Sequence, residues 1–175
     1  MRLITIQHKE VLKTLLGKLT YYAERTKREM LQRPYRTMIK HYGWNGIKAP
    51  VFGCVVGEPC EFMGCSTKDA YILTLEVPDE KVRLQAYYKW TETCYFLSHS
   101  DEWHQDYELP DYMEMVLNGL GLTNKYMAVQ ATFPYIRPEW LKAYEPYTDS
   151  FQKYINSGGK NVLEDWSKIN RMEKS

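Results

Sequence analysis

The sequence predicts one α+β domain with a small mixed or antiparallel sheet of about five or six strands and flanking helices. Short stretches that alternate or are rich in β-branched residues recur along the chain. Between them lie apolar stripes with helical spacing and prolines suited to helix starts. The domain is predicted to cover residues 1–156, and residues 157–175 are predicted to form a polar tail after a Ser-Gly-Gly joint.

The N-terminal elements are a strand and a helix. Residues 2–7 (RLITIQ) alternate in part and contain β-branched side chains, which indicates a strand. Apolar side chains then follow a helical stripe up to Leu19, so a helix is predicted over residues 8–16, with Gly17 at its end. The charged residues 22–33 predict an exposed helix.

Proline and glycine mark the elements that follow. Pro34 suits the first turn of a further helix over residues 35–42, which Gly43 would cap. After a turn at 43–46, strands are predicted at 49–56, 71–77 and 82–87, separated by a loop at 57–69 and a Pro-Asp-Glu turn.

The C-terminal half is predicted to be more helical. Aromatic residues 88–105 indicate a helix, and Pro110 is expected to open a short helix that ends near Gly119. A strand is predicted over residues 125–133. Pro138 is then expected to start the last substantial helix, which Pro146 must break or kink.

Charge and hydropathy exclude several function classes. The 23 basic and 22 acidic residues give a net charge of +1, which argues against an electrostatic nucleic-acid binder. No segment approaches the ~20 apolar residues of a membrane helix, and the N-terminus lacks a signal-peptide pattern. We therefore expect a cytoplasmic protein, without a membrane partner, whose four cysteines are reduced.

The aromatic content is high, with 15 tyrosines, 5 tryptophans and 5 phenylalanines. Tyr and Trp combine an apolar body with a polar tip, which suits a partly hydrated cleft or an interface. A tyrosine-rich core explains the same composition, so both interpretations stay open.

Metal and nucleophile motifs are weak. Cys60 and Cys65 have four residues between them, but Cys54 lies on a predicted buried strand as a core thiol, so no metal site is predicted. On a helix, Ser100 and His104 would share a face, as an acid–base pair or as part of a solvated polar loop. No catalytic residue is assigned.

Two strands carry polar residues on alternate positions. In the stretch MAVQATF (127–133), Gln130 and Thr132 share a face with Ala128, opposite a plainly apolar face. Thr5 and Gln7 likewise share a face of the first strand. Together the two strands are able to line a pocket, although solvated strand faces carry the same residue types.

Several stretches in order resemble an uncharacterised bacterial and phage family, domain-of-unknown-function family 3841. The stretches are LITIQ (3–7), PYRTM (34–38), APVF (49–52), LTLEVPDEKV (73–82), Trp90, and QATF (130–133) through EW (139–140). They cover most of residues 1–145, but Phe52 and Gly53 stand where similar chains are tryptophan-rich, and the loop after that strand is shorter. The resemblance implies a fold and little more.

A fainter resemblance concerns the ADP-ribosyltransferase fold, in particular DNA-modifying toxins. The late strand of those enzymes carries a glutamate that orients the nicotinamide ribose, after a step similar to Gln130-Ala131. Thr132 stands at the glutamate position, and the first strand offers Thr5 and Gln7 where those enzymes place His or Arg with Thr. The resemblance implies NAD as a candidate cofactor.

Threonine has no charge with which to stabilise an oxocarbenium-like ribose, and losing one aimed electrostatic group typically costs about 10²–10³ in rate. The chain would therefore keep the fold without the chemistry, or use another carboxylate such as Glu76 or Glu139. Glu139 follows Pro138 and is better explained as the favourable first-turn carboxylate of a helix.

The predicted function is binding of a nucleotide-like small molecule or a protein partner through an aromatic cleft. Tyr35 and Trp90 are expected to stack on a base, although core packing explains each alone. The predicted ligand-binding residues are Thr5, Gln7, Tyr35, Trp90, Gln130 and Thr132. Two alternatives remain: an ADP-ribosyltransferase-like enzyme that uses NAD, and an interaction protein without a small ligand, such as a phage inhibitor of a host system.

Overall fold

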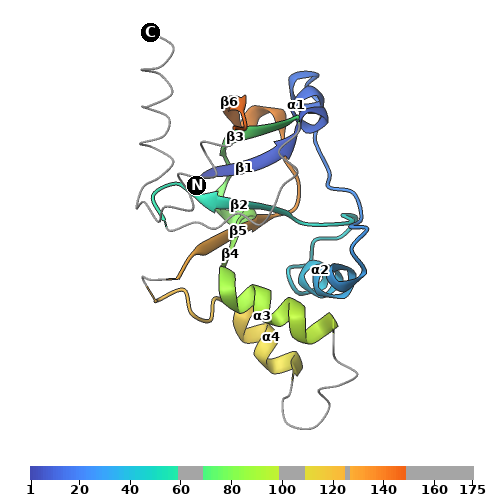
Figure 1. The fold of residues 1–175 in the computed structure, drawn as a ribbon, viewed down its shortest axis with the longest axis vertical. Coiled ribbons are helices and arrows are strands. Elements are labelled where there is room, and N and C mark those ends of the chain that lie inside the picture. The colour runs from blue at the N-terminus through green and yellow to red at the C-terminus, as the bar shows by residue number, and fades with distance from the viewer. Residues whose placement is uncertain (59–68, 99–108, 125–126, 149–175) are drawn as a thin grey trace.

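Six antiparallel strands form one sheet in the order β4-β5-β2-β1-β3-β6 (Figure 1). The computed structural model describes residues 1–58, 69–98, 109–124 and 127–148. The strands are β1 (Arg2–His8), β2 (Val51–Val55), β3 (Ala70–Glu76), β4 (Arg83–Ala86), β5 (Val129–Phe133) and β6 (Leu141–Pro146). The predicted α+β class, with a small antiparallel sheet and flanking helices, is confirmed.

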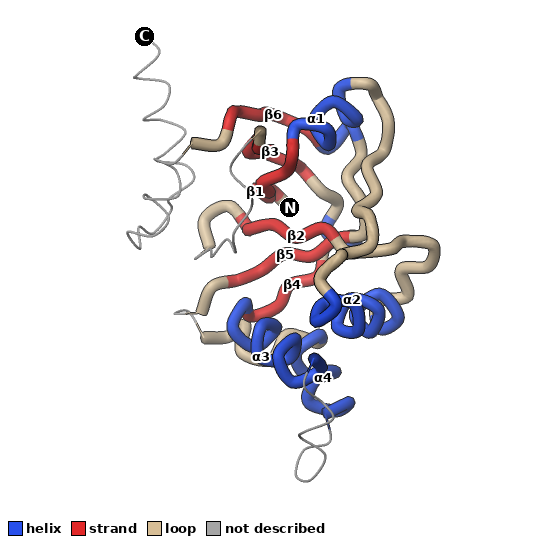
Figure 2. The backbone as a smooth tube through the Cα atoms, turned by 45° about the vertical axis from the view of Figure 1, so that its right-hand side comes forward, coloured by secondary structure: helices blue, strands red, loops and turns tan. Residues whose placement is uncertain are grey.

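Helices cover both faces of the sheet. The described helices are α1 (Lys9–Leu16), α2 (Glu29–His41), α3 (Tyr87–Ser98) and α4 (Leu109–Leu117), with short 3₁₀ turns η1 (Asp79–Lys81) and η2 (Pro138–Trp140). Figure 2 shows α1 near β1 and β3, whereas α2, α3 and α4 gather at the β4 end of the sheet. None of the described helices is long and apolar enough to cross a membrane.

The two sheet faces carry different cores. On one face, Leu12 and Leu15 of α1 pack with Leu3, Leu73 and Phe133 of the strands. On the other face, α2, α3 and α4 pack against one another around Met38, Trp90 and Val116, and Phe52 of β2 contacts this cluster. The sheet therefore separates an α1 layer from a three-helix layer.

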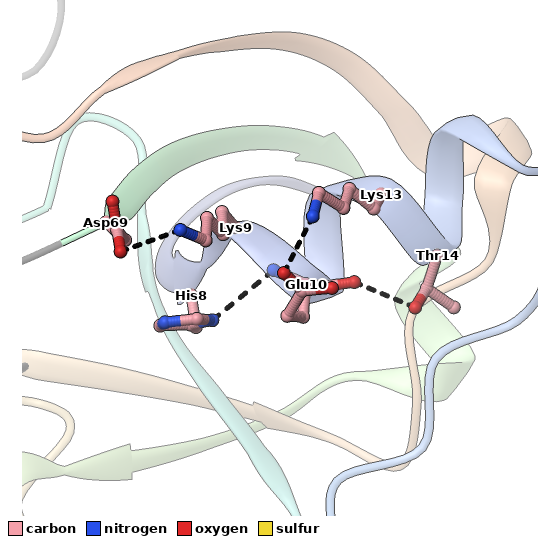
Figure 3. A network of polar contacts seen from close by, with 6 residues as sticks. All are labelled: His8, Lys9, Glu10, Lys13, Thr14 and Asp69. Atoms are coloured by element: carbon pink, nitrogen blue, oxygen red, sulfur yellow. Dashed lines mark hydrogen bonds and ion pairs between the residues drawn. The ribbon is translucent and has the colours of Figure 1, made fainter.

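Helix α1 begins in a surface network of polar contacts (Figure 3). The ring Nδ1 of His8 accepts from the backbone N–H of Glu10, and Lys9 pairs with Asp69 at 2.7 Å. Lys13 pairs with Glu10 at 2.8 Å, so the charges on this helix are largely neutralised. Leu16 and Leu19 are exposed, because the helix ends at Gly17 before the predicted stripe is complete.

The predicted helix over residues 22–33 is wrong for residues 22–28, whereas residues 29–33 are helical as the first part of α2. Tyr21 instead forms a β-bridge with Ile136, through backbone hydrogen bonds of 2.8 and 3.0 Å. This bridge holds the connection extended, and α2 begins only at Glu29. Pro34 is therefore inside α2 rather than in its first turn, and its side chain is buried. Burial of the ring offsets the backbone hydrogen bond that proline cannot donate.

The predicted last helix after Pro138 is also wrong. Pro138 starts only the 3₁₀ turn η2, and residues 141–146 form β6, which pairs with β3 at the sheet edge. Pairing with the free edge of β3 outweighs the local helix signal. Pro146 ends the edge strand, where a missing backbone donor is tolerated. The predicted tail, residues 157–175, lies outside the described residues.

Candidate functional site

At the centre of the sheet, β1 and β2 are paired over a short stretch only. These strands pair only at Leu3–Val55 and Ile4–Cys54, whereas β1 pairs with β3 along its whole length. Beyond Ile4 the side-chain hydroxyl of Thr5 donates to the carbonyl of Phe52 at 2.7 Å. A side chain therefore replaces the backbone ladder at this end of the seam.

Gly53 allows the strands to approach closely just before they separate. A Cβ atom at this position would lie 2.7 Å from the carbonyl oxygen of Ile4, which is closer than real Cβ contacts come. Only glycine fits this approach without displacing the backbone.

A cavity of about 430 Å³ is lined by residues at this end of the seam. Its walls come from β1, β2, β5, α2, α3 and the segment between α1 and α2. We call it the aromatic cavity because rings from four elements line it: Tyr21, Tyr35, Phe52, Tyr87, Trp90 and Tyr95. Its volume lies within the roughly 300–1,000 Å³ of typical small-molecule sites.

Five of the six predicted ligand-binding residues line the aromatic cavity. They are Thr5, Gln7, Tyr35, Trp90 and Gln130. The sixth, Thr132, does not line it: its side chain is fully buried and its hydroxyl donates to the amide oxygen of Gln85. The structure thus brings the two glutamines of β1 and β5 to one cavity but holds Thr132 in the core.

The strand register explains how these residues meet. Ile4, Cys54 and Gln130 are opposite one another in neighbouring strands, so their side chains lie on one face of the sheet. Thr5 and Gln7 belong to the other face by alternation. They line the same cavity as Gln130, beside the point where the pairing of β1 with β2 ends.

The polar groups of the cavity differ in their hydrogen bonding. The amide nitrogen of Gln7 donates to the hydroxyl of Thr5 at 2.8 Å, and Thr5 donates onward to Phe52. The amide nitrogen of Gln130 is buried and has no hydrogen-bond partner within the part of the chain that the structure describes. Gln130 therefore lines the aromatic cavity, and its amide nitrogen is itself buried in the wall and unpaired among the described residues.

The rings form a connected wall. The ring centroids of Tyr35 and Phe52 are 5.3 Å apart, and those of Phe52 and Trp90 are 6.5 Å apart. Trp90 is buried in the three-helix core, so core packing accounts for most of its surface. Tyr35 is half-buried, and burial raises the pKa of its hydroxyl to about 12, so it stays protonated at neutral pH.

The charged and nucleophilic groups of the lining are few. Arg28 is the one charged residue among the described lining residues, and none of those residues is a carboxylate. Burial raises the pKa of the Cys94 thiol to about 12, so this cysteine is not a thiolate nucleophile at neutral pH. The cavity offers shape, ring faces and hydrogen bonds rather than acid–base groups.

The two alternative carboxylates lie elsewhere. Glu76 ends β3 and pairs with Lys142 at 3.5 Å, and Glu139 pairs with Arg137 at 3.5 Å in the η2 turn. Neither lines the aromatic cavity. Glu139 lies in the 3₁₀ turn η2 instead of in the first turn of the predicted helix.

Other candidate residues fall partly outside the description. Cys60, Cys65, Ser100 and His104 lie outside the described residues. Cys54 is buried as predicted, but it is disulfide-bonded, so the expectation of a reduced thiol is wrong at this position. Among the described residues, no group of three or more His, Cys, Asp or Glu side chains is placed to hold a metal ion.

Sequence reasoning missed much of the α3 wall and the ring of Phe52. The α3 residues that line the cavity have helical spacing along one stripe: Tyr87, Trp90, Thr91, Cys94 and Tyr95. That helical spacing was the one feature of the sequence from which this wall could have been predicted. It identifies the residues that share a helix face, but it does not show whether that face packs in a core or lines a cavity. Phe52 was placed on a predicted strand beside Gly53, but its sequence position did not indicate that its ring lines a cavity.

Comparison with known proteins identified no relative of this chain. No family model matches the chain, and neither a curated protein nor a solved structure was found to be similar to it. The resemblances to domain-of-unknown-function family 3841 and to ADP-ribosyltransferases therefore stay predictions.

Proposed function

We propose that the aromatic cavity binds a small nucleotide-like molecule through a flat heteroaromatic ring. The observation that carries this proposal is the buried, unpartnered amide nitrogen of Gln130, a residue that lines a cavity walled by aromatic rings. A buried donor without an acceptor costs about 1–3 kcal/mol. A ring carbonyl or ring nitrogen of a bound ligand would remove that cost.

The wall chemistry favours a planar ligand. The connected rings of Tyr35 and Phe52 offer faces for stacking, and Tyr35 stays neutral with a hydroxyl able to donate. Gln130 would orient the ligand ring by donating a hydrogen bond to an acceptor on that ring. Gln7 and Thr5 would form part of the cavity wall and keep the hydrogen bond between them. A nucleobase or a nicotinamide ring has this shape and acceptor pattern.

Binding is favoured over group transfer. Stabilisation of an oxocarbenium-like transition state is most often the work of a carboxylate, and the described lining has none. NAD therefore enters the proposal as a ligand to be tested and not as a substrate. A protein partner at the cavity mouth, where Tyr95 is half exposed, is the competing outcome of the same test.

The test is thermal unfolding of the full chain with millimolar adenosine, nicotinamide, ADP-ribose and NAD. A ligand at one hundred times its dissociation constant stabilises the native state by about 2.7 kcal/mol, which moves the midpoint by several degrees. We expect at least one probe to do so. If none of the four shifts the midpoint, the small-ligand proposal is wrong and a protein partner becomes the better explanation.

Two variants connect such a shift to the site. Gln130→Met keeps the side-chain length but removes the donor, and we expect about three- to tenfold weaker binding by calorimetry. Gln7→Met is the matched control, because the Gln7 nitrogen already donates to Thr5, and its loss should be smaller. Equal affinity of wild type and Gln130→Met would contradict the assigned role of Gln130.

A further inference from the structure

The near-zero net charge conceals a basic segment. Residues 24–48 contain seven Lys or Arg residues and two Glu residues, and the rest of the chain contains sixteen basic and twenty acidic residues. Positive charge is therefore concentrated in α2 and the segments that flank it. The whole-chain balance says little about the charge of this surface.

A second hollow lies within this basic segment. It has a volume of about 440 Å³ and is bounded by α2, the segment before it and the loop after it. We call it the basic groove, after its cationic side chains Arg25, Arg36, Lys40 and Lys48, which stand beside the rings of Tyr35 and Trp44. No Asp or Glu is among its described lining residues.

The cations of the basic groove are only partly neutralised. Lys48 pairs with Glu24 at 2.8 Å, but Arg25 donates to the neutral amide of Gln32 at 2.6 Å and has no ion-pair partner among the described residues. Within the described residues, Arg36 and Lys40 take part in no ion pair.

Arg36 and Lys40 are also one helical turn apart on α2. Like charges at this spacing repel and destabilise a helix by a few tenths of a kcal/mol. On α1 the equivalent pair, Lys9 and Lys13, is neutralised by Asp69 and Glu10. The helix α2 thus keeps an unfavourable pair that a bound anion would make favourable.

We propose that the basic groove binds a phosphate-bearing small ligand, either free pyrophosphate or the diphosphate of a nucleotide. Arginine guanidinium groups suit the bidentate recognition of phosphate oxygens, and Lys40 and Lys48 add point charges. Tyr35 lines both the basic groove and the aromatic cavity. The nucleotide case rests on the proposed function, whereas the pyrophosphate case does not.

The test is titration of the full chain with inorganic pyrophosphate at low ionic strength, followed by calorimetry. We expect binding that weakens as salt is added, because exposed charges are screened. The double variant Arg36→Gln/Lys40→Gln should lose at least tenfold in affinity. No binding of pyrophosphate to the wild-type protein would overturn the proposal.

The matched control is Lys9→Gln/Lys13→Gln, which removes the same charge at the same helical spacing from α1. Its affinity for pyrophosphate should change less than twofold. Equal losses in the two double variants would mean that overall charge, and not the basic groove, attracts the anion. That outcome would overturn the proposal.

Further probes separate this inference from the proposed function. Adenosine has no phosphate, so its binding should weaken in Gln130→Met and stay unchanged in Arg36→Gln/Lys40→Gln. If pyrophosphate binds in the basic groove while adenosine, nicotinamide, ADP-ribose and NAD all fail to bind, the cavity proposal is wrong and the groove proposal stands. Binding of a single-stranded oligonucleotide without binding of pyrophosphate would overturn the small-ligand assignment in favour of a nucleic-acid surface.

Discussion

Gln85 and Gln130 lie directly opposite each other on β4 and β5, with both side chains on the face covered by α2, α3 and α4. Gln85 is fully buried, and both ends of its amide are used: its nitrogen donates to Tyr42 at 2.7 Å, and its oxygen accepts from Thr132. Tyr42 in turn donates to the carbonyl of Leu117. Gln130 is half-buried, and its nitrogen has no partner in the described part of the chain.

The contrast separates a structural amide from a candidate binding amide. A buried network in which every group is satisfied joins strands and helices and specifies one arrangement of the core. A buried donor without a partner contributes nothing to that arrangement, and the proposed function assigns it to a bound ligand. The same side chain on two neighbouring strands is therefore bonded into the core in one case and left without a partner for its nitrogen in the other.

Among the substitutions that test this comparison, Gln85→Leu should have the largest effect on the free energy of unfolding. It removes the groups that satisfy Thr132 and Tyr42, and we expect a loss of about 2–3 kcal/mol in the free energy of unfolding. Urea denaturation followed by circular dichroism measures this loss. A change below about 0.5 kcal/mol would mean that the network is not maintained in solution.

Gly53→Ala tests the close approach that precedes the aromatic cavity. The new methyl group would meet the carbonyl of Ile4 at 2.7 Å, and we expect a loss of about 1–3 kcal/mol in the same denaturation experiment. Gly17→Ala is the control, because Gly17 has a negative φ and its nearest described neighbours would lie at 3.3 Å or more. Equal stability of wild type and Gly53→Ala would show that the seam adapts without cost.

The pH dependence of the free energy of unfolding at alkaline pH tests the burial of Tyr42 in the network and of Tyr35 in the cavity wall. Burial raises the pKa of each hydroxyl from 10.0 to about 12. Between these values the folded protein holds a proton that the unfolded chain has lost, so the free energy of unfolding falls as the pH rises. Below pH 10 this contribution to stability is fully present. Denaturation across this range measures the fall.

Tyrosine-to-phenylalanine variants show which hydroxyl causes the fall in the free energy of unfolding at high pH. Tyr42→Phe and Tyr35→Phe should each make the free energy of unfolding less sensitive to pH between about 10 and 12. A profile unchanged by both substitutions would contradict the burial of these hydroxyls.

Gln130→Leu should have the smallest effect on stability. Removing a buried donor without a partner leaves no other group unsatisfied, so we expect the free energy of unfolding to stay equal or to rise by up to about 1 kcal/mol. Urea denaturation beside Gln85→Leu gives the comparison directly. A loss as large as that of Gln85→Leu would show that Gln130 has a structural partner.

Periodicity predicted most of this fold. The alternation in β1, β3 and β5 was sufficient to identify them as strands, and Gly17 correctly marked the end of α1. The extended connection at Tyr21 and the edge strand β6 were missed, because their backbones are held by distant partners that local propensity does not reveal.

The candidate site was predictable in part. Alternation placed Gln130 and Thr132 on one face, but only the helices packed over β4 and β5 decide that Thr132 is enclosed by Gln85 while Gln130 meets a cavity. Gln7 and Gln130 line the same cavity beside the point where the pairing of β1 with β2 ends. A single strand carries no signal for where its pairing with a distant strand ends.

The short seam between β1 and β2 also divides the sheet into two groups of three strands, β4-β5-β2 and β1-β3-β6. Few backbone bonds join the groups, so each is a candidate unit of local opening. Amide hydrogens of β3 opposite β1 should then exchange with solvent more slowly than those at the seam. A ligand bound between the two groups of strands would make them open together. Its binding should therefore slow the exchange of amide hydrogens on both sides of the seam.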